Sequence, residues 1–184
     1  MRFEEREIRL KDGRICILKP NSPENAEAML RYLKETSAET DFLLRYPDEI
    51  QWTLEQEKEL LQSILDNPYQ IMMVAMVDGR VAGNAAINGT GPQRKLCHRC
   101  SLAIALYKEF WGLGLGSAMI GYLTELAAST GAWTQIDLEV VAENEKAKKL
   151  YEKCGFIESG RRHNALKSDD GTLHDEILMY KDLT

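Results

Sequence analysis

The sequence contains no hydrophobic run long enough to cross a membrane. Its longest fully apolar stretch, residues 71–77, has seven residues, whereas a transmembrane helix needs about 20. Residues 1–7 are mostly charged and lack the apolar core of a secretory signal peptide. These absences favour a cytoplasmic protein over a secreted or membrane-embedded one.

Cysteine is scarce, which argues against a disulfide framework. The four cysteines are Cys16, Cys97, Cys100 and Cys154. Without an export signal we expect them to be reduced thiols in a cytoplasm. The spacing of Cys97 and Cys100 is typical of half a zinc site, but a structural zinc site usually needs a second ligand pair. We therefore expect no bound metal, and we interpret this pair as small residues at the start of a strand.

An excess of positive charge is also absent. Lys and Arg number 23 and Asp and Glu number 29, so the formal net charge is −6. Binding to nucleic acid without sequence preference depends on cationic contacts to phosphate, so we expect no nucleic-acid partner. The chain has 184 residues and no repeat or flexible linker. This length predicts a single domain over residues 1–184, because domains typically have about 100–200 residues.

The first part of the chain predicts a hairpin followed by two helices. Asp12-Gly13 separates short strands over residues 8–10 and 15–18. Ser22 and Pro23 are typical of a helix start, and Thr53 with Gln56 fits a capping box. Helical spacing predicts buried faces on both helices. These faces comprise Ala26, Met29, Leu30 and Leu33 in the first helix, and Leu60, Leu61, Ile64 and Leu65 in the second.

The remainder of the chain predicts mostly strands, with two further helices. The strands are expected over residues 69–77, 80–88, 102–106, 136–141, 156–163 and 173–181, and the helices over about 114–129 and 144–153. Strands that follow one another without strict helix alternation are typical of the α+β class. We therefore expect a mixed, largely antiparallel twisted sheet flanked by about four helices.

A glycine-rich segment connects a predicted strand to a predicted helix. It reads Trp111-Gly112-Leu113-Gly114-Leu115-Gly116-Ser117. The first N–H groups of a helix lack internal partners and its dipole favours an anion there, while glycine lets the backbone approach a phosphate closely. The segment thus predicts a phosphate-bearing ligand, with tight strand–helix packing as the alternative. It lacks the Lys of a P-loop and the third Gly of the dinucleotide fingerprint.

This segment resembles the acetyl-coenzyme A signature of the GCN5-related N-acetyltransferase family. The family pattern is Arg or Gln, two residues, Gly, one residue, then Gly or Ala. Gly114 and Gly116 match the two small positions, and Trp111 stands where Arg or Gln is usual. A second block also resembles the family, in the expected order. It comprises Leu138-Glu139-Val140, Asn144, Ala147, Leu150-Tyr151, Cys154-Gly155-Phe156, Asp170-Gly171 and residues 175–179.

The resemblance implies a GNAT-like fold and an enzyme that uses acetyl-coenzyme A as co-substrate. It would acetylate a primary amine of a small molecule, peptide or protein N-terminus by direct attack. In the family the backbone of the strand before the loop pairs with the pantetheine arm and loop amides bind the pyrophosphate. The implied cofactor-binding residues are Ile104, Leu106, Gly112, Leu113, Gly114, Leu115, Gly116, Ser117 and Asn144. For Asn144 an ordinary helix N-cap is the alternative.

We name two candidate catalytic residues, of which the resemblance implies only the first. Tyr151 matches the family tyrosine that protonates the departing thiolate, and the alternative for it is packing of the ring on the sheet. Glu139 is our first candidate for the base that deprotonates the amine, and a solvated strand face is its alternative. Ser101, His98 and His163 stay open as bases acting through water. Family members often carry Glu near the position of Ser101.

The acceptor side and the partners are less defined. In the family the loop between the first two helices faces the acceptor, and residues 41–47 resemble members near the ribosomal-protein acetyltransferases. Residues that would line an acceptor pocket, or else form a solvated loop, are Asp41, Arg45, Tyr46, Asp48, Glu49 and Trp52. Homodimers are common in the family. A non-catalytic acyl-coenzyme A sensor would retain the glycine-rich loop without needing Tyr151. In either case we expect local positive charge near the loop, with Lys146 or Lys149 contributing.

Overall fold

An eight-stranded sheet forms the centre of the computed structural model, which describes residues 1–183. The strand order is β1-β2-β3-β4-β5-β6-β8-β7. The strands are β1 (Arg6–Arg9), β2 (Ile15–Pro20), β3 (Gln70–Val77), β4 (Arg80–Gly89), β5 (Arg99–Leu106), β6 (Gln135–Val141), β7 (Ile157–Lys167) and β8 (Leu173–Asp182). Within this sheet only β5 and β6 pair in parallel. The expected mixed, largely antiparallel sheet is therefore confirmed.

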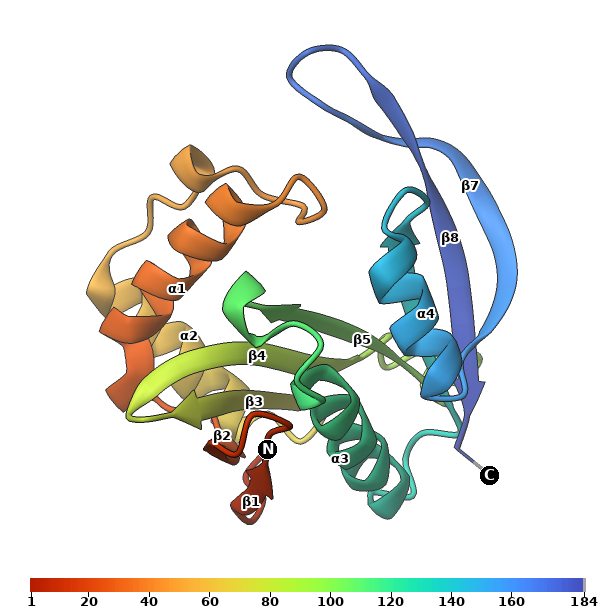
Figure 1. Ribbon diagram of the computed structural model, residues 1–184. Coiled ribbons are helices and arrows are strands. Elements are labelled where there is room, and N and C mark those ends of the chain that lie inside the picture. The colour runs from red at the N-terminus through yellow and green to blue at the C-terminus, as the bar shows by residue number, and fades with distance from the viewer. Residues whose placement is uncertain (184) are drawn as a thin grey trace.

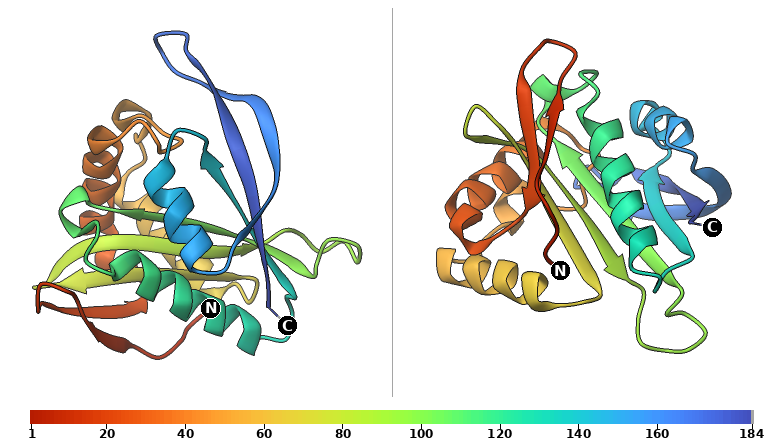
Figure 2. Two further views of the ribbon diagram at one scale, coloured as in Figure 1. Left: turned by 45° about the vertical axis from the view of Figure 1, so that its right-hand side comes forward. Right: turned by 90° about the horizontal axis from the view of Figure 1, so that it is seen from below.

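Two helices cover each face of the sheet (Figures 1 and 2). The helices are α1 (Ala26–Glu39), α2 (Leu54–Asp66), α3 (Leu115–Ser129) and α4 (Glu145–Lys153). Helices α1 and α2 lie on one face, and α3 and α4 lie on the other. This arrangement confirms the α+β class with four helices. Within residues 1–183, every helix is too short or too polar to span a bilayer.

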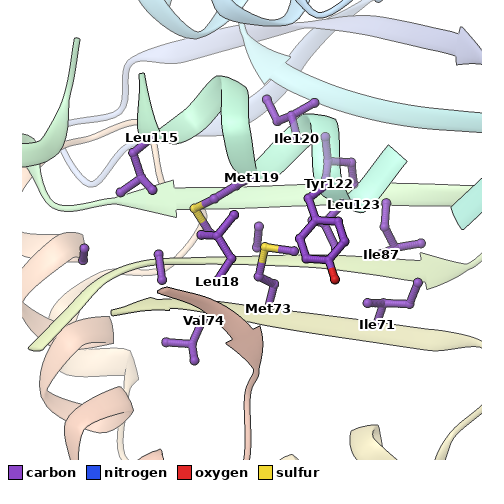
Figure 3. Packing of buried hydrophobic residues seen from close by; sticks show 14 of the residues in the cluster. Leu18, Ile71, Met73, Val74, Ile87, Leu115, Met119, Ile120, Tyr122 and Leu123 are labelled. Atoms are coloured by element: carbon purple, nitrogen blue, oxygen red, sulfur yellow. The ribbon is translucent and has the colours of Figure 1, made fainter. Parts of the chain in front are cut away.

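The core under α3 explains the longest apolar run of the sequence. Side chains of α3 pack on the central strands β2, β3 and β4 (Figure 3). The fully buried members are Leu18, Ile71, Met73, Ile87, Leu115, Met119, Ile120 and Leu123. Helices also cover β3 on its other face. Both the odd- and the even-numbered residues of β3 are therefore apolar, as is typical of a strand buried on both sides. Each such side chain contributes about 1.5–3 kcal/mol by leaving water.

The buried face of α2 differs from the prediction. Leu60, which we expected in the core, is 47% exposed, whereas Glu57 is 2% exposed. Helix α2 is thus turned so that Glu57 and Leu61, one helical turn apart, both face inward. The indole N–H of Trp52 donates to the Glu57 carboxylate at 2.6 Å, which offsets part of the cost of burying a carboxylate. Burial raises the pKa of Glu57.

The start of α1 also differs in detail from the prediction. Pro23–Asn25 form a 3-10 turn before the helix, and the Ser22 side chain makes no capping hydrogen bond. The capping box at Thr53 is confirmed, because Gln56 N–H donates to the Thr53 hydroxyl at 3.2 Å. The residues typical of helix starts therefore predicted where both α1 and α2 begin. Only the start of α2 has the expected hydrogen bonds.

Strands β5 and β6 separate after a short parallel ladder. Their pairing ends at Ser101 and Asp137. Beyond this point β5 continues to Leu106 paired only with β4, and β6 continues to Val141 paired only with β8. The left view of Figure 2 shows β6, in teal behind α4, turning away from β5, in green. The second half of β5 therefore has an edge with no strand partner, and such an edge presents free N–H and C=O groups.

Candidate active site

The free edge of β5 presents the backbone groups of Ile104 and Leu106. On the opposite edge, Thr90 N–H donates to Arg99 O at 3.0 Å and Tyr107 N–H donates to Ala82 O at 3.2 Å. Successive residues of a strand point their backbone groups to alternate edges. Odd-numbered residues therefore face β4, whereas Ile104 and Leu106 face the side where β6 has separated. This is the edge on which a pantetheine arm would pair, although the role of these two residues stays a prediction.

A tyrosine of α1 is built into the ladder between β4 and β5. The Tyr32 hydroxyl donates to Ala105 O at 2.6 Å and accepts from Asn84 N–H at 3.1 Å. Asn84 and Ala105 are register partners, so the phenol replaces a direct ladder bond and fixes the end of β5. Burial raises the pKa of Tyr32, which keeps the hydroxyl protonated. The sequence analysis missed this residue, although its spacing from Met29 places it on the same helix face.

The glycine-rich loop ends in a helix start with free donors. Gly112 has φ of +77° and Gly114 has φ of +91°, in the left-handed region that favours glycine. The first hydrogen bond of α3 runs from Ala118 N–H to Gly114 O at 3.1 Å, and no side chain caps the helix. The N–H groups of residues 115–117 therefore have no intrahelical acceptor. This arrangement suits an anion such as a phosphate.

Gly116 has a packing role as well. A Cβ atom there would lie 2.9 Å from Leu150 Cδ2 and 3.5 Å from Leu106 Cδ1. Helices α3 and α4 and strand β5 thus meet at a position where a side chain would have to displace Leu150. Gly112, in contrast, has no heavy atom within 4 Å of such a Cβ. Close packing therefore explains Gly116, whereas a role of Gly112 in ligand approach stays a prediction.

Lysines surround the glycine-rich loop. The Lys11 side chain passes Gly114, where its Cε would lie 4.0 Å from an added Cβ atom. The Nζ atoms of Lys108 and Lys146 lie 5.8 and 5.4 Å from the Trp111 ring centroid. The prediction of cationic side chains beside the helix start agrees with this placement of Lys146. A chain of net charge −6 therefore still has basic groups where a phosphate would bind.

Tyr151 lies on α4 with its ring in the core. The residue is 8% exposed, and its ring meets Phe156 edge-on with 6.0 Å between centroids. Burial raises the pKa of Tyr151 to about 12. The only fully enclosed side-chain polar atom without a partner in residues 1–183 is His174 Nδ1. Because the Tyr151 hydroxyl also has no hydrogen-bond partner there, it must reach open space. The Tyr151 ring therefore packs in the core, as the alternative for this residue predicted. Its hydroxyl is still available to a ligand.

Asn144 has the structural role that we named as its alternative. Its Oδ1 accepts from Ala147 N–H at 3.2 Å, so it is the N-cap of α4. The capping bond uses only the oxygen of the side-chain amide. The Nδ2 donor has no acceptor within residues 1–183, and a role of Asn144 in cofactor binding stays a prediction.

Glu139 lies close to the point where β5 and β6 separate. Ser101 is the register partner of Asp137, and Glu139 follows two residues later on the same face, since strand side chains alternate. This is the face that α1 contacts through Tyr32. The Glu139 carboxylate is half exposed and accepts from Arg162 at 2.7 Å. Arg162 also donates to Glu176 at 2.7 Å.

The other candidate bases lie in different places. Ser101 shares the strand face with Glu139, and its hydroxyl donates to Asn88 O at 3.4 Å. His98 is exposed in the loop before β5. The His163 side chain is 81% exposed on β7, where Asp175 lies 3.0 Å from its Nδ1. The structure therefore brings Ser101 and Glu139 near one another and leaves both histidines outside this group.

The predicted acceptor loop is largely bonded to itself. Glu49 accepts from Tyr46 N–H at 2.8 Å, and Arg45 lies 5.8 Å above the Trp52 ring. These contacts, with the bond from Trp52 to α2, fix the connection between α1 and α2. The exposed members of the predicted set are Asp41, Arg45, Asp48 and Glu49.

Comparisons with known proteins identify the family. The profile of the acetyltransferase (GNAT) family matches residues 29–156, which is more than half of the chain. A candidate ribosomal protein bS18-alanine N-acetyltransferase of Bacillus subtilis (strain 168) is 29% identical over 129 residues, covering 70% of this chain and 78% of that protein.

Solved structures share the fold. The crystal structure of an acetyltransferase of the GNAT family from Streptococcus pneumoniae has a TM-score of 0.86 and 27% identity, covering 92% of this chain and 99% of that one. A ribosomal-protein-alanine N-acetyltransferase from Brucella melitensis has a TM-score of 0.78 and 20% identity, covering 90% and 98%. The chain therefore belongs to the acetyltransferase (GNAT) family, as an acetyl-coenzyme A-dependent N-acetyltransferase.

Proposed function

We propose that this protein transfers the acetyl group of acetyl-coenzyme A to a primary amine of a small molecule, a peptide or a protein N-terminus. One observation carries the proposal: the free edge of β5 leads directly into a helix start with free N–H donors. An extended amide-bearing arm fits the strand edge, and a pyrophosphate fits the helix start. Coenzyme A has both chemistries in one molecule.

The cofactor would lie along β5 with its phosphates at the loop. The N–H and C=O groups of Ile104 and the N–H of Leu106 are the strand donors and acceptors for the pantetheine arm. The pyrophosphate would accept from the amides of residues 112–117. The Nδ2 atom of Asn144 would donate to the same arm. Each of these groups is free within residues 1–183, so each fits the ligand without breaking a protein hydrogen bond.

The chemistry requires a base on one side and an acid on the other. Glu139 would take the proton from the substrate ammonium, directly or through water, and free the nitrogen lone pair to attack the acetyl carbon. As the carbon–sulfur bond breaks, Tyr151 would give its hydroxyl proton to the departing thiolate. The excess proton on the newly acylated nitrogen would return to the Tyr151 oxygen, directly or through water, which leaves a neutral amide. Its pKa of about 12 keeps Tyr151 protonated at neutral pH. A thiol in the same apolar surroundings also has a raised pKa. The pKa of the thiol therefore lies closer to the pKa of Tyr151 than it would in water.

The acceptor is an amine whose identity the relatives only suggest. The name of the Bacillus subtilis relative specifies an alanine of ribosomal protein bS18. We therefore include peptides that begin with alanine among the acceptors to be tested, beside amino acids and small amines. A cytoplasmic location would suit such acceptors. The runner-up function is a non-catalytic acyl-coenzyme A sensor, which would use the same loop.

Melting curves and a thiol-release assay test the proposal. At acetyl-coenzyme A concentrations about 100 times Kd, binding to the native state alone stabilises by about 2.7 kcal/mol. For a chain of this size that predicts a rise in Tm of roughly 5–10 °C. Amine-dependent release of free thiol would then establish catalysis. Absence of a Tm shift would contradict the proposal, and a shift without release for any amine would favour the sensor.

A further inference from the structure

Trp111 occupies the loop position where Arg or Gln is usual in the family, and its side chain makes a specific bond. The indole Nε1–H donates to the backbone carbonyl of Leu106 at 3.1 Å. Leu106 is the last residue of β5. The bond therefore ties the glycine-rich loop to the end of the strand along which the pantetheine arm would lie.

The Leu106 carbonyl, which accepts from the Trp111 indole, has no strand partner. Leu106 points its backbone groups to the free edge of β5, as the alternation along the strand requires. A strand carbonyl without a donor is unfavourable when water is displaced from it. The indole satisfies this carbonyl from within the chain. As a result, the Leu106 N–H is available to a ligand, and one acceptor position of the Leu106 carbonyl is already taken.

The loop is also held on its other side. Lys11 N–H, in the turn between β1 and β2, donates to Leu113 O at 3.1 Å. Gly112 thus lies between two fixed points, the Trp111 side chain and the Leu113 carbonyl. Gly112 and Gly114 have no side chains of their own to hold the loop, and both have positive φ. The direction of the free amides in residues 112–117 therefore depends on these two anchors.

The indole ring also connects the loop to α4. Lys146 lies in the first turn of α4, and its Nζ is 5.4 Å from the Trp111 ring centroid. An ammonium above an indole face is attracted by about 0.5–1 kcal/mol at an exposed site. Trp111 is thus in contact with β5 through its N–H and with α4 through its ring.

We propose that Trp111 is a positioning residue for cofactor binding. Its indole N–H holds the glycine-rich loop on β5, so that the amides of residues 112–117 converge on one phosphate position. Trp111 acts through the Leu106 carbonyl and needs no contact with the reacting atoms. This inference rests on the proposed function, because it assumes that the loop binds the pyrophosphate of coenzyme A.

The test uses variants that separate the ring from the donor. Trp111→Phe keeps an aromatic ring and removes the N–H, whereas Trp111→Gln and Trp111→Arg supply a side-chain donor without the indole. We expect Trp111→Phe to raise the Kd for coenzyme A and the KM for acetyl-coenzyme A about fivefold to tenfold, the effect of one lost hydrogen bond. The kcat value and the acceptor KM should stay within about twofold. At least one donor variant should restore most of the affinity.

The outcomes are distinguishable by calorimetric titration with coenzyme A and by melting temperature. If the wild-type protein does not bind coenzyme A, the proposed function fails. If wild type binds and Trp111→Phe binds equally well, only the role of Trp111 is overturned. It is also overturned if all three variants lose affinity equally while keeping the wild-type Tm. A lowered Tm together with equal increases in the KM values for cofactor and acceptor would show a general folding defect. That outcome would contradict a positioning role.

Discussion

The hydroxyl of Tyr46 accepts a hydrogen bond of 3.0 Å from the backbone N–H of Asp169. Tyr46 lies in the connection between α1 and α2, and Asp169 lies in the turn between β7 and β8. The bond joins two segments 123 residues apart. The hairpin that it holds also supplies Arg162, the partner of Glu139. The acceptor loop and the neighbourhood of the proposed base are thus connected through a single hydroxyl.

Tyr46→Phe should weaken binding of the acceptor amine and leave the cofactor unaffected. The substitution keeps the ring and removes the acceptor for Asp169 N–H, so the two segments lose their direct link. We expect the acceptor KM to rise about threefold to tenfold, in line with one net hydrogen bond, at an unchanged KM for acetyl-coenzyme A. Tyr69→Phe is the matched control, since Tyr69 is 62% exposed. Equal effects of the two variants would contradict this prediction.

Tyr151→Phe should lower kcat at least tenfold while coenzyme A binds with wild-type affinity, because only the hydroxyl would act as the acid. The pKa of about 12 has a further consequence. A phenol with a raised pKa stays protonated as pH increases, so Tyr151 should cause no loss of rate below about pH 11. Initial rates from pH 6 to 10.5 measure this. An alkaline decline in this range that disappears in Tyr151→Phe would contradict the raised pKa of Tyr151. An unchanged kcat in Tyr151→Phe would contradict its role as the acid.

Glu139→Gln should reduce the rate most strongly at low pH, where the substrate amine is protonated and needs a base. The side chains have nearly the same size, and Arg162 would keep Glu176 as a partner. The measurement is the acidic limb of kcat/KM against pH. Glu152→Gln, an exposed residue on α4, is the control. An acidic limb that does not move in Glu139→Gln would leave Ser101 as the candidate nearest the site.

Gly116→Ala should destabilise the protein, and Gly121→Ala should not. The added methyl group at position 116 would lie 2.9 Å from Leu150 Cδ2, whereas nothing lies within 4 Å of the equivalent atom at Gly121. Overpacking typically costs about 1–3 kcal/mol, and alanine in a helix interior is favoured over glycine by roughly 1 kcal/mol. Urea denaturation should therefore shift the two midpoints in opposite directions. A stabilised Gly116→Ala variant would contradict the close packing of α3 on α4.

Much of the fold could be predicted from local patterns. Asp12-Gly13 turns β1 into β2, and Thr53 begins α2 with the expected hydrogen bonds. The prediction for Leu60 was wrong, because periodicity identifies an apolar stripe but not the rotation of a helix about its axis. The contact between Trp52 and Glu57 decides that rotation, and a buried carboxylate is not expected from a hydrophobic pattern. The site residues were named from motifs, and their roles are still predictions.

The sequence by itself determined the order of strands and helices, the free helix start after Gly114 and the candidate residues for the chemistry, whose roles are still predictions. These depend on turn preferences, side-chain periodicity and backbone freedom, all of which act over a few residues. Only the tertiary structure decided where β5 parts from β6, how Tyr32 enters the ladder and which carbonyl Trp111 satisfies. Each of these contacts depends on how whole elements pack against one another, and the packing of distant segments leaves no short-range pattern in the chain.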